Sequence, residues 1–329
     1  MDTYGTDNWG MIGHEWAVNL LAGRIAAGRV SHAYLFTGPP GIGKTTLATR
    51  LAQALNCLHP SPPCLACRAC NLIGRGLHAD FQIIAPEGQS IKIEAIRDLQ
   101  QELYLHPLEA RYRVAIIQDV QSATGHAADA LLKTLEEPPA TTRLLLTADV
   151  AEKVMPTIVS RCQVVPLRPV PAREIAVALA ERFDLAPDKA NTLAQLSGGR
   201  PGWALEAAQN PDFLAARRQS LDRLLAVLRA DRVGRFTASE ELSRSEGLPQ
   251  VLDIWQSLWR DVLLLVEASR VPPVNSDRLD DLRRLAAEVT PDEAHRALRA
   301  VWHTLEALNR NANTRLALDV LMLDMPTVR

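Results

Sequence analysis

One segment of the chain has the residue types that bind the phosphates of a nucleotide. Residues 38–45 (GPPGIGKT) fit the pattern G-x-x-x-x-G-K-[ST]. Glycines let backbone N–H groups turn toward phosphate oxygens, and a helix that begins here directs its positive end at the same anion. The lysine can reach the β- and γ-phosphates, and the threonine hydroxyl can ligate Mg²⁺. The candidate residues for binding ATP or ADP with Mg²⁺ are Gly38, Pro39, Pro40, Gly41, Ile42, Gly43, Lys44, Thr45 and Thr46.

Four of the five cysteines lie within fourteen residues, with a spacing that suits a metal ion. They are Cys57, Cys64, Cys67 and Cys70. Zn²⁺ takes four thiolates in a tetrahedron, and four protein ligands leave no open position, so the spacing predicts a structural zinc site. The alternatives are four free thiols and a set that includes His59, which we expect instead to be solvated. Cys162 lies far along the chain and is interpreted as an ordinary small residue.

Composition limits the classes of protein to which the chain can belong. The 329 residues are 47% apolar and 22% charged, which suits folded domains and argues against a disordered chain. A formal net charge of −2 argues against a globally basic nucleic-acid-binding protein. No apolar run is long enough to cross a bilayer, and the polar start of the chain lacks the order of a signal peptide. These features predict a cytoplasmic protein without membrane contact.

Short apolar runs alternate with helical patterns through the first half of the chain. Helical spacing extends from about residue 9 to 30, ahead of the first run, and the phosphate-binding segment follows that run. Alternation of this kind predicts an α/β fold with a five-stranded parallel sheet covered on both faces. The runs that predict strands lie at residues 33–37, 81–85, 114–117, 144–147 and 164–167.

The pattern changes after the last predicted strand. Pro166, Pro169 and Pro171 indicate a linker, and helical patterns continue from there to the end. We therefore predict a nucleotide-binding domain at 1–168 that contains a zinc module at about 57–70. A small helical lid domain at 169–210 and an all-helical oligomerisation domain, or collar, at 211–329 complete the expected organisation.

Several segments resemble the AAA+ clamp-loader subunits of bacterial DNA polymerase III. A four-cysteine module directly after the first helix of the nucleotide-binding domain is shared by some members of that family. In Ser160-Arg161-Cys162, the resemblance implies that Arg161 acts in trans, as an arginine finger, on the ATP of a neighbouring subunit. The matching segments are residues 31–39 (SHAYLFTGP), 130–139 (ALLKTLEEPP), 155–162 (MPTIVSRC), 308–313 (LNRNAN) and 316–318 (LAL).

Two departures from the family's ATPases indicate which type of subunit this is. Where they carry Asp-Glu after the third strand, this chain has Gln118-Asp119, and Asp119 is one methylene shorter than the catalytic Glu. A shift by one position would make Asp119 the acid that supports Mg²⁺, still without a catalytic Glu beside it. Where the lid of the ATPases carries an arginine, this chain has Gly202. The resemblance therefore implies a delta-prime-type subunit whose own ATPase activity is weak or absent.

The resemblance also implies partners. They are gamma/tau and delta subunits in a hetero-oligomer, the sliding clamp, and primer-template DNA held by the assembled complex. Other functions left open are an active gamma/tau-type ATPase, a different AAA+ remodelling ATPase, and a scaffold that binds no nucleotide. Arg161 has an alternative interpretation as an ordinary surface arginine. Lys133, Glu136 and Glu137 are interpreted as a solvated helix face.

Overall fold

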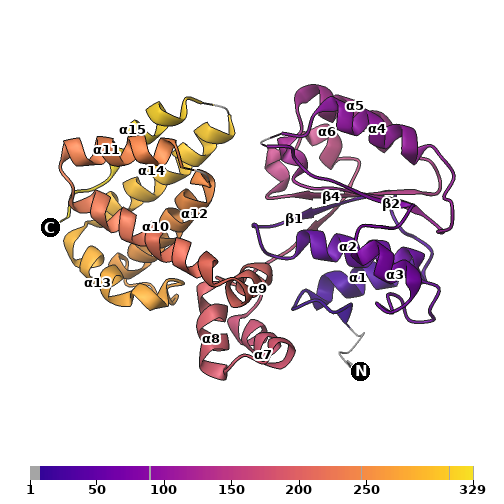
Figure 1. Cartoon of the computed structure of the whole chain (residues 1–329), viewed down its shortest axis with the longest axis horizontal. Helices are drawn as coiled ribbons and strands as arrows, with labels where there is room; N and C mark the ends of the chain where they lie inside the picture. Colours follow the sequence, from indigo (N-terminus) through magenta and orange to yellow (C-terminus); the bar gives the residue numbers. More distant parts are fainter. Residues whose placement is uncertain (1–7, 89, 246, 311, 329) are drawn as a thin grey trace. The chain divides into compact units, whose positions relative to one another are not determined.

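The structure is a computed structural model that describes residues 8–88, 90–245, 247–310 and 312–328 (Figure 1). The expectation about the polar start of the chain falls largely outside these ranges, as does Asn311 of the terminal segment. The described residues form two compact units. The first contains the residues up to Arg182 together with Gly199–Trp203, and the second contains Phe183–Gly198 and the residues from Ala204 onward.

The first unit is built on a five-stranded sheet in which every pair of neighbouring strands is parallel. The strand order is β2-β3-β4-β1-β5, so the first strand lies between the fourth and the fifth. All five strands expected from the apolar runs are present, and the predicted five-stranded parallel sheet is confirmed. Their bounds are β1 Ala33–Thr37, β2 Phe81–Ile84, β3 Arg113–Ile117, β4 Thr142–Ala148 and β5 Gln163–Pro166.

Helices cover both faces of this sheet, as Figure 1 shows. On one face lie α1 (Glu15–Ala26), α2 (Lys44–Asn56) and α3 (Arg68–Gly74). On the other lie α4 (Ile93–Leu103), α5 (Gly125–Glu136) and the short α6 (Pro156–Val159). The alternating side chains of the strands divide between two buried cores, one under each helical layer. Two 3₁₀ turns, η2 (Val120–Ser122) and η3 (Ala151–Lys153), follow β3 and β4.

The first helix is shorter than its apolar spacing predicts. The spacing suggested helix from about residue 9, but α1 begins at Glu15. Trp9, Gly13 and His14 all have positive φ, which interrupts a right-handed helix. Trp9 is nevertheless buried in the core on that side of the sheet, so periodicity marked its burial correctly and its conformation wrongly.

The rest of the chain is helical. Trp255 and Trp259 are fully buried in the core of the second unit, which confirms a helical C-terminal region with its own core. Among the described residues, no helix combines the length and apolar character that crossing a bilayer requires. The bounds are α7 Ala172–Phe183, α8 Pro187–Leu196, α9 Pro201–Gln209, α10 Pro211–Arg229, α11 Arg232–Ser243, α12 Leu248–Val266, η4 Ser276–Arg278, α13 Leu279–Glu288, α14 Pro291–Asn309 and α15 Thr314–Asp324.

A buried carboxylate fixes the loop between α4 and β3. Asp80, which is 0% exposed, accepts backbone N–H bonds from Leu108, Glu109 and Ala110 at 2.8–3.0 Å. Arg113 lies 3.2 Å from the same carboxylate. Burial raises the pKa of Asp80, but the backbone donors and Arg113 outweigh it and hold the pKa below its ordinary value. Asp80 therefore stabilises the fold in its ionised form.

We predict that Asp80→Asn lowers the free energy of unfolding at pH 7 by about 2–4 kcal/mol, because one oxygen becomes an amide that cannot accept. A carboxylate with a depressed folded-state pKa stabilises the fold above its unfolded pKa of about 3.9, and that contribution is lost as pH falls below it. The difference in free energy of unfolding between variant and wild type, measured by urea unfolding, should therefore become smaller as the pH falls from 7 to 3.5. Asp98→Asn, at an exposed position of α4, is the control. A gap of constant size would show that packing, not charge, is responsible.

Candidate functional site

The phosphate-binding segment lies at the carboxyl edge of the sheet, between β1 and α2. Lys44 is the first residue of α2, and its side chain is only 8% exposed. Its ammonium donates to the Gly38 carbonyl at 2.6 Å and to Asp149 Oδ1 at 3.2 Å. Asp149 directly follows β4, the strand paired with β1, so the parallel sheet brings both groups to one edge. The buried cation is thus paired with a carboxylate.

Sequence reasoning missed Asp149. The signal that could have found it is its position immediately after a predicted strand, because carboxyl ends of parallel strands meet at the same edge. Asp149 also lies 3.7 Å from Lys153, so its charge is shared between two lysines.

The backbone of the phosphate-binding loop is held from two sides. His14 Nε2 lies 2.9 Å from the Ile42 carbonyl. The Gly202 N–H donates to the Gly41 carbonyl at 2.7 Å. A Cβ at position 202 would lie 2.9 Å from that carbonyl oxygen, closer than such atoms approach. In this conformation, therefore, no side chain fits at position 202.

The residues after β3 lie beside the loop. Gln118 Nε2 lies 3.5 Å from the Thr45 hydroxyl oxygen, the atom expected to ligate Mg²⁺. Asp119 has a left-handed φ of 47°, and its N–H donates to the Thr147 hydroxyl at 3.0 Å. The group next to Thr45 is therefore a neutral amide. An amide oxygen can bind a cation but adds no negative charge to its site.

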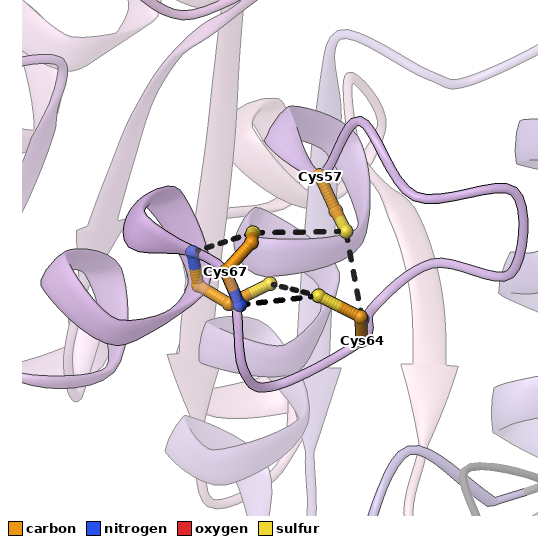
Figure 2. A group of neighbouring side chains, drawn as sticks. Cys57, Cys64 and Cys67 are labelled. Carbon is orange, nitrogen blue, oxygen red and sulfur yellow. Dashed lines mark hydrogen bonds between the residues drawn. The ribbon is translucent and has the colours of Figure 1, made fainter.

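The four clustered cysteines form a compact group of sulfur atoms (Figure 2). All four sulfurs lie within 4.8 Å of one another, and the Cys57–Cys67 and Cys64–Cys70 pairs are each 4.0 Å apart. Zn–S bonds of about 2.3 Å in a tetrahedron separate sulfurs by about 3.8 Å, so the group fits zinc closely. The His59 side chain is exposed and does not belong to this group, although the His59 backbone N–H donates to Cys57 Sγ at 3.4 Å. The four-cysteine set that the spacing predicted could therefore hold the ion without it.

Burial and neighbouring hydrogen-bond donors shift the pKa values of these thiols. Burial raises the pKa of Cys64, but the amides of Ala66 and Cys67 outweigh it and lower the pKa to about 6. Burial raises the pKa of Cys57 and of Cys70. The surrounding amides thus favour the thiolate form of Cys64, and bound metal would displace the remaining protons.

The surrounding elements fix where the cysteines lie. Asn56, the residue before Cys57, exchanges two hydrogen bonds with the backbone of Tyr112, at 3.0 and 2.9 Å. Gln53 donates to the Cys70 carbonyl at 2.7 Å. The module is therefore attached to α2 and to the loop before β3 by polar contacts independent of the metal.

Arg161 lies just beyond α6, in contact with the end of α5. Its guanidinium donates to Glu136 Oε1 at 2.7 Å and to the Thr157 carbonyl at 2.9 Å, and its side chain is 35% exposed. Glu136 is exposed, as expected for a solvated helix face, and it also pairs at the surface with this arginine. Its neighbour Glu137 is exposed, as expected.

Comparison with known proteins identifies the family. The family described as "DNA polymerase III, delta subunit" matches residues 13–171, and its C-terminal counterpart matches residues 211–327. DNA polymerase III subunit delta' of Bacillus subtilis is 30% identical over 312 residues, which cover 93% of this chain and 94% of that protein. The chain belongs to the delta-prime family of DNA polymerase III.

Other relatives connect the delta-prime family to a second subunit type. The delta' subunit of Escherichia coli is 34% identical over 63% of this chain and 62% of its own length. A DNA polymerase III gamma subunit from Buchnera aphidicola is 38% identical over 46% of this chain and 42% of that protein. The predicted clamp-loader resemblance, with its AAA+ fold, is confirmed.

We predict that Cys64→Ala abolishes zinc binding, measured as one equivalent of zinc per chain in the wild-type protein by metal analysis. Loss of a structural zinc site should also lower the melting temperature, because the free energy of metal binding contributes to folding. Cys162→Ala is the matched control, because that thiol lies outside the cluster and burial raises its pKa to about 12. Full zinc content in the Cys64 variant would contradict a four-thiolate site.

Proposed function

We propose that this chain is a delta-prime-type subunit of a cytoplasmic clamp loader that helps to place the sliding clamp on primed DNA. It acts on nucleotide bound by a neighbouring gamma/tau-type subunit, through Arg161. Its own phosphate-binding loop binds ATP or ADP weakly and turns it over slowly or not at all. The zinc site is structural, and the C-terminal helices hold the chain in a hetero-oligomer with gamma/tau and delta subunits.

The observation that carries this proposal is the Gln118 amide beside Thr45. An ATPase of this kind needs a carboxylate there to support Mg²⁺ and a second one to polarise the attacking water. Gln118 supplies no negative charge, and the backbone of Asp119 has a left-handed conformation. Misplacement of a catalytic group by about 1 Å can reduce a rate a hundredfold. We therefore expect ATP hydrolysis at this loop to be slow or absent.

The contacts of Lys44 support the same conclusion. A nucleotide phosphate would compete with the Gly38 carbonyl and the Asp149 carboxylate for this ammonium. Position 202 carries a glycine, so no arginine reaches the nucleotide from there. Its backbone lies against Gly41, which leaves no room for a side chain. The Arg161 side chain, by contrast, is 35% exposed, and a neighbouring subunit could meet it. An arginine that contacts a transferring phosphate in trans can accelerate its hydrolysis by several orders of magnitude.

The direct test is the steady-state ATPase of the reconstituted loader with clamp and primed DNA. We predict that Arg161→Ala lowers the rate at least tenfold, whereas Thr45→Ala and Lys44→Ala in this subunit leave it nearly normal. Thermal melts must show that the variants fold, since Lys44→Ala leaves Asp149 without this partner. A normal rate with Arg161→Ala, or collapse with both loop variants, would contradict the proposal.

An active gamma/tau-type ATPase is the second candidate, favoured by the complete phosphate-binding pattern through Lys44 and Thr45. The variant Gln118→Asp distinguishes this candidate function from the delta-prime-type one. If Gln118 limits Mg²⁺ binding, this variant should tighten Mg-ATP binding to the isolated chain by about tenfold, the effect of one added charge near a bound cation. Binding in EDTA should be unchanged. A wild-type chain that already binds Mg-ATP tightly and hydrolyses it would favour the ATPase.

A further inference from the structure

A carboxylate holds the arginine that the proposed function needs. Glu136 is in the last turn of α5 and is joined to Arg161 by a 2.7 Å ion pair. The Thr157 carbonyl at 2.9 Å and the Ser160 hydroxyl at 3.4 Å contact the other terminal nitrogen of the same guanidinium. Both ends of the planar group are therefore bound to its own subunit, on two different elements.

These contacts set the direction of a side chain that would otherwise be mobile. An arginine side chain has about 2 kcal/mol of rotamer entropy to lose when it is fixed. Glu136 and the α6 backbone impose that loss before any neighbour arrives. The guanidinium has five N–H donors, and these contacts leave some of them for a phosphate.

We propose that Glu136 is the positioning residue for Arg161: it holds the guanidinium in the orientation in which a neighbouring subunit's γ-phosphate meets it. The inference rests on the proposed function. Glu136 need not touch the nucleotide, since it acts through the arginine. Its hydrogen bond is what matters, so a neutral acceptor of similar shape can replace it.

The size of the effect follows from exposure. Glu136 is 51% exposed and Arg161 35% exposed, and ion pairs at such surfaces stabilise weakly. Loss of Glu136 should therefore reduce the contribution of Arg161 without abolishing it, about threefold to tenfold. Loss of Arg161 itself should have the larger effect.

The test compares Glu136→Ala, Glu136→Gln and Glu137→Ala in the reconstituted loader with clamp and primed DNA. We expect Glu136→Ala to lower kcat about threefold to tenfold with KM nearly unchanged. Glu136→Gln should retain at least half of the wild-type rate, because its amide oxygen still accepts from the guanidinium. Glu137→Ala is the matched control: it removes an adjacent exposed carboxylate of the same helix end and should have no effect.

A double variant separates positioning from general damage. Glu136→Ala added to Arg161→Ala should cause no further loss, because Glu136 acts only through that arginine. A further loss in the double variant would overturn the inference, as would a normal rate with Glu136→Ala while Arg161→Ala collapses. A normal rate with Arg161→Ala would instead remove the proposed function on which the inference rests.

Discussion

Parallel pairing in the sheet is the constraint on which the nucleotide site depends. With β1 between β4 and β5, and β3 beside β4, the carboxyl ends of these strands meet at one edge. The phosphate-binding loop, Gln118 and Asp149 all follow those ends and so lie together despite long separations in sequence. Buried apolar side chains on both faces of the strands fix the register, because a slip by one residue would move each side chain into the core on the opposite face.

The charges of the residues at this edge of the sheet determine the chemistry of the nucleotide site. The Lys44 ammonium is buried and requires a negative partner, which Asp149 supplies. Gln118 carries no negative charge, and the backbone of Gly202 lies against the Gly41 carbonyl, where a side chain would not fit. In the proposed function, the site keeps the shape of a phosphate-binding loop but lacks groups that ATP hydrolysis needs. In the proposed account, the arginine that matters is Arg161, which serves another subunit.

Local sequence patterns predicted most of the fold and the four members of the cysteine cluster. Apolar runs identified five strands, and cysteine spacing identified a four-thiol group that a metal could join. Contacts between distant segments were beyond such patterns: Asp149 with Lys44, Glu136 with Arg161, and the backbone approach of Gly202 to Gly41. Each depends on where the fold brings two segments together. The start of α1 was misplaced because periodicity reports burial, not the φ angles of residues such as His14.

The most direct measurement of the central claim is an experimental structure of the assembled loader with a non-hydrolysable ATP analogue and Mg²⁺. The account predicts that the Arg161 guanidinium lies within hydrogen-bonding distance of a γ-phosphate held by the adjacent subunit, while Lys44 of this chain remains paired with Asp149. Arg161 in solvent, with Mg-nucleotide seated on Lys44 and Thr45 and a water in line for attack, would contradict it.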